Sequence, residues 1–227
     1  MDVHATVAQP LRKPRGRPRK PPEARDEGNR RRALVRAAAQ LFRHHGFAAV
    51  STRDLAAAAG MCSGSPFYHF ESKSALLYAV MQEGMEQAVR SQQAMLEHLP
   101  ADAAPPAQLA ALVRHHFEVL FGPDGDFIPV MLYEWRSLGA KERGSVAQLR
   151  TVYEAPWMPV LQALHASGQL RIAPRMARLF IFGALNWAVQ WYRPGGPLTL
   201  DGLSEQALCL FLGPADGVVP TKNHGDC

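Results

Sequence analysis

STRDLAAAAGMCSGSPFYHFESKSALL, residues 51–77, carries the start and stop signals of consecutive helices within a short space. Ser51 and Asp54 form the Ser-x-x-acid pattern of a capping box, in which each side chain binds the backbone N–H of the other residue. Gly60 follows a run of alanines and is a typical helix terminator. The first part of the stretch therefore predicts a short capped helix over residues 51–60.

A second short helix is predicted after a tight turn. Pro66 is unfavourable inside a helix, but if Ser63 is the N-cap, Pro66 falls in the first turn, where backbone amides have no helical partner to lose. Phe70 closes this helix. Ser72 then caps a long segment with helical apolar spacing that runs to Pro100.

Helical patterns continue on both sides of this stretch. Residues 29–47, NRRRALVRAAAQLFRHHGF, space their apolar side chains as a helix does and end on a basic turn followed by Gly46. Beyond Pro100 no segment alternates as a strand does, and helical spacing recurs over residues 105–121, 127–138, 141–167 with bends at Pro156 and Pro159, 174–192 and 201–212. The sequence therefore predicts an all-α fold of about nine helices.

The composition divides the chain into four parts. Residues 1–27 are basic, rich in proline and without helical spacing, so we expect a disordered arm. Residues 28–72 hold the first three helices, residues 73–213 form a larger helical bundle, and residues 214–227 form a flexible polar tail.

The positive charge of the chain is concentrated near the N-terminus. The net charge is +5, and residues 1–36 hold 11 Lys/Arg against 4 Asp/Glu, whereas the remainder is slightly acidic. Such asymmetry indicates a polyanionic partner for one end. Because no apolar face accompanies the charge, nucleic acid is favoured over a membrane surface.

Other features narrow the class of protein. Cys62, Cys209 and Cys227 are odd in number and show neither a disulfide framework nor zinc spacing. No signal-peptide pattern and no apolar run of membrane-spanning length is found, so we expect a cytoplasmic protein. No nucleophile motif and no phosphate-binding glycine loop stands out, so we expect no enzyme activity, no cofactor and no metal.

Two short helices joined by a tight turn, after a first helix, have the arrangement of a helix-turn-helix. An α-helix fits the major groove of DNA, and its first residues meet the base edges. Here those residues are Ser63, Gly64 and Ser65, which are small enough to let the backbone approach the bases. The sequence therefore predicts that the second of the two short helices reads DNA.

The stretch from Arg32 to Met81 resembles the DNA-binding region of the TetR family of transcriptional regulators. The match rests on a Gly-x-x-x-Gly-x-x-aromatic-x-x-Phe pattern over residues 60–70, followed by a Ser-Lys pair. The resemblance implies a homodimer whose first three helices bind double-stranded operator DNA. It also implies a linking fourth helix and a bundle that holds a small-molecule effector and the dimer interface.

The resemblance further implies which residues of the helix-turn-helix face DNA. They are Thr52, Arg53, Ser63, Gly64, Ser65, Phe67, Tyr68, His69 and Lys73. Phe67 departs from the family pattern, which usually has a tyrosine whose hydroxyl reaches a phosphate, and Tyr68 is the neighbouring residue that carries a hydroxyl. Ser63 departs as well, because the family often has Lys or Arg there.

The N-terminal arm contains PRGRPRK, residues 14–20, whose Arg-Gly-Arg-Pro core resembles an AT-hook. Proline and glycine keep such a strip thin and extended, which suits the narrow minor groove of A·T-rich DNA. Two alternatives stay open, a tail that binds phosphates without reading sequence and a solvated tail. The DNA-contacting residues expected in the arm are Arg15, Gly16, Arg17, Pro18 and Arg19.

The C-terminal half gathers aromatic and apolar residues that would line an effector pocket, although a plain bundle core needs the same residue types. The candidate pocket residues are Phe117, Met131, Trp135, Tyr153, Trp157, Trp187 and Trp191. The last two helices carry more apolar surface than one bundle face needs, which favours a dimer interface. The candidate interface residues are Phe180, Phe182, Leu185, Leu208 and Phe211.

The segment LNWAVQWYRPGG, residues 185–196, resembles the branch of the TetR family that responds to acyl-CoA thioesters. The resemblance implies a small apolar or acyl-CoA-like effector. The sequence as a whole predicts a ligand-responsive transcriptional repressor. The alternative is an architectural or constitutive DNA-binding protein, in which the C-terminal half serves dimerisation alone and no effector binds.

Overall fold

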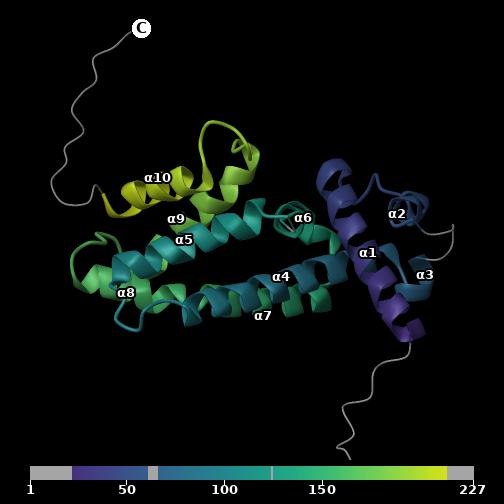
Figure 1. Ribbon diagram of the computed structural model, residues 1–227, viewed down its shortest axis with the longest axis horizontal. Helices are drawn as coiled ribbons and strands as arrows, with labels where there is room; N and C mark the ends of the chain where they lie inside the picture. The colour runs from purple at the N-terminus through teal and green to yellow at the C-terminus, as the bar shows by residue number, and fades with distance from the viewer. Residues whose placement is uncertain (1–21, 61–65, 124, 214–227) are drawn as a thin grey trace, which may run out of the picture.

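A computed structural model describes residues 22–60, 66–123 and 125–213, and these residues form α-helices, two short 3-10 helices and no strand. The prediction of an all-α fold is therefore confirmed. The helices are α1 (Pro22–His45), α2 (Thr52–Ala58), α3 (Pro66–His69), α4 (Lys73–Glu97), α5 (Pro105–Phe121), α6 (Phe127–Glu134), η1 (Trp135–Ser137), α7 (Ala140–Glu154), α8 (Trp157–Ala166), α9 (Pro174–Trp187), η2 (Ala188–Gln190) and α10 (Leu200–Leu212) (Figure 1).

Helix boundaries differ from the sequence prediction at two places. Helix α1 begins at Pro22, within the segment that we expected to be a disordered arm. A proline followed by acidic residues suits a first helical turn, because proline loses no hydrogen bond there and carboxylates favour the N-terminal end of the helix dipole. The segment 141–167 is two helices, since Pro156 lacks an N–H and stands between α7 and α8 as the N-cap of α8.

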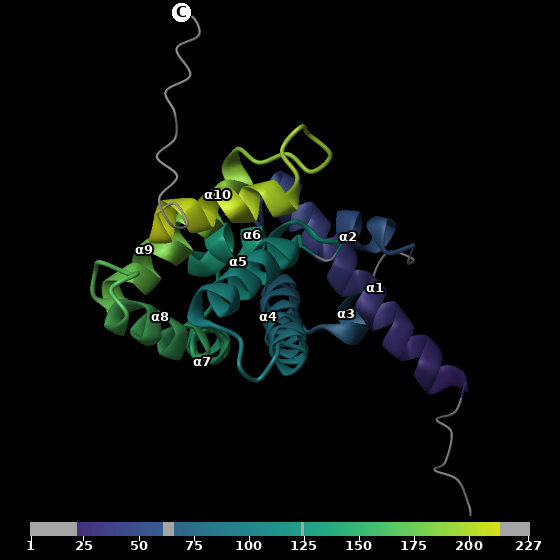
Figure 2. The same cartoon turned by 60° about the vertical axis from the view of Figure 1, so that its left-hand side comes forward.

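The first three helices pack as one unit on the beginning of α4. Helix α1 ends at Gly46, which has a φ of 78°, and this left-handed conformation turns the chain toward α2. Phe42, Leu55 and Leu76, from α1, α2 and α4, are almost completely buried in the shared core. Figure 1 and Figure 2 show α4 leaving this three-helix unit and continuing into the bundle.

The remaining helices form the bundle around α4 and α5. Helix α4 packs along α7, and α5 packs against both α8 and α10. The centre is apolar and closely filled: Leu109, Leu112, Trp157 and Leu161 have no measurable exposure. Because α4 contributes to both cores, any tilt of α4 in the bundle moves the three-helix unit as well.

Helix α6 is a second connection between the bundle and the three-helix unit. At its start, Arg43 Nη1 of α1 donates a hydrogen bond of 2.6 Å to Asp126 Oδ1. At its end, the Phe47 backbone N–H donates one of 2.8 Å to Glu134 Oε1. Between them, the buried ring of Phe127 lies against Gly84 of α4. Helix α6 is thus held by both α1 and α4.

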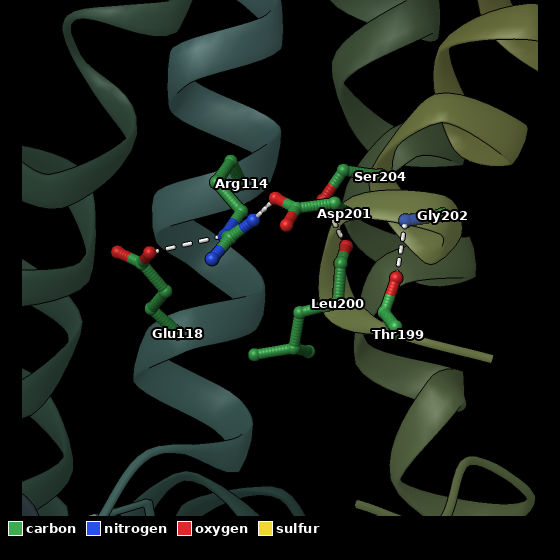
Figure 3. Close-up of polar contacts among 7 residues, drawn as sticks. All are labelled: Arg114, Glu118, Thr199, Leu200, Asp201, Gly202 and Ser204. Atoms are coloured by element: carbon green, nitrogen blue, oxygen red, sulfur yellow. Dashed lines mark hydrogen bonds and ion pairs between the residues drawn. The ribbon is translucent and has the colours of Figure 1, made fainter. Parts of the chain in front are cut away.

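Helix α10 is fastened to α5 by polar contacts near its first turn (Figure 3). Arg114 of α5 points toward α10 and pairs with Asp201, and its Nε also donates to Glu118 Oε1 at 3.0 Å. Thr199 caps the helix, because its Oγ1 accepts a hydrogen bond of 3.1 Å from the Gly202 N–H. These contacts fix where the outer face of α10 is presented.

Gly84 is the position where added side-chain volume has the clearest consequence. A Cβ at Gly84 would lie 2.1 Å from the Phe127 ring. In the variant Gly84→Ala we expect a net loss in the free energy of unfolding of about 1–3 kcal/mol, because overpacking exceeds the gain in helix propensity. The measurement is urea unfolding followed by circular dichroism.

The matched control is Gly144→Ala in α7, where a Cβ would meet nothing within 4 Å. That variant should gain up to about 1 kcal/mol from helix propensity alone. Equal effects of the two substitutions would contradict the close packing of Phe127 on α4.

Candidate functional site

The turn into α2 is built by the capping box that the sequence predicted. Ser51 Oγ accepts a hydrogen bond of 3.2 Å from the Asp54 N–H, and Asp54 Oδ2 accepts one of 2.9 Å from the Ser51 N–H. The hydrogen bond from the Ser51 side chain, followed by that from its backbone, lowers the pKa of Asp54 below its ordinary value. The start of α2 is therefore rigid, and it presents Thr52 and Arg53 in a fixed position.

The described residues of the helix-turn-helix expose several of the predicted DNA contacts. Arg53 is exposed and Thr52 is half-buried. Tyr68 of α3 is 76% exposed, and its hydroxyl donates a hydrogen bond of 3.1 Å to Glu27 of α1. The half-buried ring of His69 packs edge-on against Tyr68. These side chains lie at the surface as DNA-contacting residues must.

Several predicted DNA contacts fall where the structure gives no side-chain information. Phe67 belongs to α3, but its side chain is outside the described part. The other residues outside the described part are Ser63, Gly64 and Ser65 of the turn, and Arg15, Gly16, Arg17, Pro18 and Arg19 of the arm.

Lys73 has a structural role that the sequence did not reveal. Its Nζ donates two hydrogen bonds of 2.8 Å, to the carbonyl oxygens of Phe47 and Val50, and lies 4.4 Å from the centre of the Phe47 ring. Two of its three N–H bonds are therefore used to tie the start of α4 to the turn between α1 and α2. This contact orients the helix-turn-helix relative to α4.

A cavity of about 690 Å³ lies between α6, η1, α7 and α9. It contains two of the seven predicted pocket residues, Met131 and Trp135, together with Phe182. Phe117, Tyr153 and Trp157 are buried in the bundle core and do not line the cavity. Of these three, Tyr153 and Trp157 pack against the ring of Phe182 in the cavity wall. That the predicted residues bind an effector stays a prediction.

The exposure of the aromatic and apolar residues on and just after α9 differs from what their predicted roles require. Trp187 and Trp191, predicted for the pocket, are 63% and 52% exposed, whereas Leu185, predicted for the dimer interface, is 1% exposed. Phe182 faces inward, with its ring centre 4.7 Å from that of Trp157. The reason is helical phase: Leu185 lies about 140° around the helix from Phe180, whereas Trp187 lies within about 20° of it.

An exposed apolar face therefore runs along α9, and we call it the α9 apolar face. Its members are Met176, Phe180, Trp187 and, just beyond the helix, Trp191. Phe180 is the one member that was among the predicted interface residues, and it is 62% exposed. Leu208 and Phe211 of α10, also predicted, are half-buried. Free monomers rarely expose a continuous apolar face of this kind, which indicates an interface.

The polar wall of the cavity is made by three arginines around one carboxylate. Glu154 lies between Arg178, with which it forms an ion pair, and Arg150, whose Nε is 3.7 Å from Oε1. The Arg150 guanidinium also lies 5.8 Å from the centre of the Trp135 ring. Arg136 lines the cavity from η1 and is exposed. With three cations and one anion, the cavity has an excess of positive charge.

A buried chain of hydrogen bonds runs from α4 to the cavity. His115 Nε2 is 2.9 Å from Ser91 Oγ, and His115 Nδ1 is 3.5 Å from the Tyr153 hydroxyl. His116 Nδ1 is 3.1 Å from the same hydroxyl, and its Nε2 is 3.2 Å from Oδ1 of Asn186, which lines the cavity. The sequence shows the His115-His116 pair but not its partners, which come from three other helices.

Burial favours the neutral form of both histidines. Loss of hydration lowers the pKa of His116 to about 4, against the smaller raising effect of its hydrogen bond to Asn186. Loss of hydration also lowers the pKa of His115. Beside these hydrogen bonds lies Gln92, whose amide is oriented so that both of its ends have partners. Its N–H donates to the Tyr153 carbonyl at 2.8 Å, and its oxygen accepts from Trp157 Nε1 at 3.2 Å. The polar groups at this point of the core are therefore paired.

A second cavity of about 670 Å³ lies between α1, α4 and α6. Its wall is dominated by charged side chains that pair with one another, including Arg31 with Glu83 at 2.5 Å and Arg90 with Glu86 at 3.7 Å. It contains none of the predicted pocket residues, so the cavity beside α9 is the better candidate for an effector.

Within residues 22–60, 66–123 and 125–213, no group of three or more His, Cys, Asp or Glu side chains is placed to hold a metal ion. Among the described helices, none is both long and apolar enough to cross a membrane.

A capped helix-turn-helix on a helical bundle that contains a cavity defines a DNA-binding regulator of the one-component type. Comparison with known proteins makes this assignment definite. Residues 34–80 match the family of bacterial regulatory proteins called tetR, and residues 102–214 match the tetracyclin repressor-like C-terminal domain. The chain belongs to the tetR family of bacterial regulatory proteins, and the resemblance seen in the sequence is confirmed.

Three similar proteins each cover most of this chain, and two of them are named as transcriptional regulators. The HTH-type transcriptional repressor KstR2 of Rhodococcus jostii (strain RHA1) is 33% identical over 211 residues, which cover 89% of this chain and 99% of the relative. The crystal structure of the superantigen PfiT is 40% identical, with a TM-score of 0.66 over 81% of this chain and 96% of that chain. The ketosteroid transcriptional regulator KstR2 of Mycobacterium tuberculosis is 26% identical, with a TM-score of 0.70 over 81% and 93%.

The low pKa of His116 predicts a pH-dependent stability. In the unfolded chain His116 takes up a proton below about pH 6.5, whereas in the folded chain it does so only below about pH 4. The contribution of neutral His116 to the free energy of unfolding is therefore complete above about pH 6.5 and is lost as the pH falls toward about 4. We expect the free energy of unfolding to fall by about 2 kcal/mol on this account between about pH 7 and about pH 5. Urea unfolding at several pH values measures this.

The variant His116→Gln is the control, because glutamine keeps an N–H donor but does not titrate. Its stability should depend less steeply on pH than that of the unaltered chain. The same slope in both proteins would contradict a buried neutral His116.

Proposed function

We propose that the chain is a homodimeric, ligand-responsive transcriptional repressor. The observation that carries the proposal is the rigidly capped helix-turn-helix, joined through α4 and α6 to a bundle that contains a cavity. Membership of the tetR family supports it. Its action is binding rather than catalysis, and we place it in the cytoplasm with the DNA.

The proposed partner of the three-helix unit is double-stranded operator DNA. Helix α3 enters the major groove, and Arg53 and Tyr68 contact the backbone on either side of it. In a dimer, two copies of α3 reach successive major grooves about 34 Å apart. The α9 apolar face and the outer face of α10 form the dimer interface, which the contact of Arg114 with Asp201 helps to position.

The basic arm adds affinity for the DNA that flanks the operator. Residues 15–19, Arg-Gly-Arg-Pro-Arg, enter the minor groove in this proposal, in the manner of an AT-hook. The start of α1 supports the arrangement, because Glu27, near that end of the helix, is bonded to Tyr68 of α3. The first part of α1, which follows the arm in the sequence, therefore lies beside the proposed recognition helix.

A small apolar or acyl-CoA-like effector is proposed to release the repressor. The cavity beside α9 is lined by three consecutive residues of α6, Met131, Leu132 and Tyr133. The same helix is bonded to α1 through Asp126 and to the following turn through Glu134. An effector that prefers one position of α6 therefore changes the orientation of the three-helix unit and the affinity for DNA.

Electrophoretic mobility shift with the region upstream of the protein's own gene tests the core of the proposal. We expect binding that persists over unrelated competitor DNA at moderate salt. A chain that lacks residues 1–21 should bind the same site more weakly and with a smaller salt dependence, because fewer counterions are released. Binding that does not distinguish the upstream region from competitor DNA would instead indicate an architectural protein.

The proposed role of α6 predicts a local effect of Glu134→Ala. The Phe47 amide loses its acceptor, so its hydrogen–deuterium exchange should become about tenfold faster or more, as for loss of a hydrogen bond to a charged group. Exchange in α5 should stay as it was.

The control variant is Ser137→Ala, which removes the other partner of the same carboxylate, a hydrogen bond of 3.0 Å from Ser137 Oγ to Glu134 Oε2. It leaves the Phe47 contact in place and should not change exchange there. If the turn after α1 exchanges equally in both variants, α6 does not hold the three-helix unit.

A further inference from the structure

Asn186 has the only primary amide side chain in the described wall of the cavity beside α9. A hydrogen bond with buried His116 fixes the orientation of that amide. Its Oδ1 is 3.2 Å from His116 Nε2. An amide oxygen only accepts hydrogen bonds, so His116 must carry its proton on Nε2. Asn186 lines the cavity, and its Nδ2 group has no partner among the described residues, so this donor is available to a bound molecule.

The rest of the buried chain agrees with this assignment of protons. A neutral His116 with its proton on Nε2 has a bare Nδ1, which accepts from the Tyr153 hydroxyl. The oxygen of that hydroxyl then remains available to His115 Nδ1. From the Tyr153 hydroxyl onward the donors point toward Asn186, and its carbonyl is the last acceptor.

The other polar side chains of the wall are donors, except for Glu154, whose carboxylate is paired with arginines. Both oxygens of Glu154 are directed at arginines, one at Arg178 and one at Arg150. The Tyr133 hydroxyl oxygen accepts from Gln190 Nε2, which leaves its own O–H to donate. Guanidinium groups have no acceptor at all. A bound molecule therefore meets N–H and O–H groups and an excess of positive charge.

The other side chains of the wall are apolar. They are Met131 and Leu132 of α6, Trp135 of η1 and Leu179 and Phe182 of α9. A fitting molecule therefore needs an apolar body as well as an oxygen-rich head.

We propose that this cavity is the effector site and that it selects an anionic, acceptor-only head, a carboxylate or a phosphate-bearing thioester, carried on an apolar body. This inference rests on the proposed function and names the ligand chemistry. Arg178 and Arg136 bind the anionic oxygens, and Asn186 Nδ2 donates to a carbonyl or carboxylate oxygen. His116 is a positioning residue, because it holds the Asn186 amide with its donor side toward the ligand.

The experiment is isothermal titration of the full chain with three probes of equal chain length: decanoate, decanoyl-CoA and decylamine. We expect decanoate or decanoyl-CoA to bind at least tenfold more tightly than decylamine. Binding of decanoyl-CoA in preference to decanoate identifies the phosphate-bearing thioester as the source of the anion, and the reverse identifies the free carboxylate. Decylamine that binds as tightly as both would overturn the proposal.

Asn186→Asp is the decisive variant, because it replaces the donor by an acceptor of the same shape. The preference for the anionic probe over decylamine should fall by about 10- to 100-fold, as expected for hydrogen bonds to charged groups. Arg178→Met keeps the apolar stem and should also lower anion affinity. The matched control is Arg175→Met, an exposed arginine of the same helix that lies outside the cavity wall and should change nothing.

The positioning role of His116 is tested by a pair of variants. His116→Gln retains an N–H that can hold Asn186 Oδ1 and should keep the preference for anions. His116→Leu removes the donor, so the amide is free to present its oxygen, and the preference between decanoate and decylamine should shrink. A residue needed for packing alone would change both affinities together and leave their ratio as it was.

Failure of this inference can be separated from failure of the proposed function. If the chain binds its upstream region specifically but Asn186→Asp leaves the anion preference unchanged, the regulator stands and this cavity is not its selective site. If the upstream region is not bound specifically, the proposed function fails whatever the titrations show.

Discussion

Two carboxylates at the ends of α6 fix the orientation of the three-helix unit relative to the bundle. Asp126 receives a hydrogen bond from Arg43 in α1, and Glu134 receives one from the amide of Phe47 in the next turn. The two acceptors are separated by roughly 12 Å along α6, so together they resist rotation of the three-helix unit as well as its separation. Phe127 completes the contact by packing where α4 has no side chain, at Gly84.

Because of these two contacts, the cavity beside α9 is linked to the orientation of the three-helix unit. Its wall includes three residues of α6, so a molecule bound there contacts the helix that orients the three-helix unit. Lys73 makes the arrangement stiffer, since it ties the turn after α1 to the first residue of α4. A rigid unit with two attachments responds to small shifts in either attachment, and a loosely tethered unit would not.

Helix α9 contacts the core, the cavity and solvent with three different sides of its surface. Ala177, Ile181 and Leu185 face the core, Arg178, Phe182 and Asn186 face the cavity, and Met176, Phe180 and Trp187 face outward. Residues 3 and 4 apart share each sector because the helix has about 3.6 residues per turn. The cavity sector therefore borders the outward sector, and a change at one is next to the other. Buried His116 stiffens the cavity side, since its neutral ring links Asn186 to Tyr153.

How far the sequence predicts this protein depends on the range of the interaction concerned. Ser51, Asp54 and Gly46 act on residues within one helical turn, so the capped α2 and the end of α1 were predictable, as was the family from residues 60–73. At Pro156 the sequence predicts a bend in one helix, whereas the structure has a break between α7 and α8.

The function of individual aromatic and charged residues was decided by tertiary structure. Trp187 and Phe182 are both large apolar residues of one helix, and composition does not say which faces solvent, because that depends on which sector the neighbouring helices cover. Lys73 and His116 are similar cases. Their partners lie 23 to 70 residues away in sequence and come together only when α1, α4, α5, α7 and α9 pack. The sequence by itself determined the helices, their caps and the DNA-binding motif, since these follow from contacts between near neighbours. Only the packed structure decided which side chains form a core, a cavity or an exposed face, since these follow from contacts between distant helices.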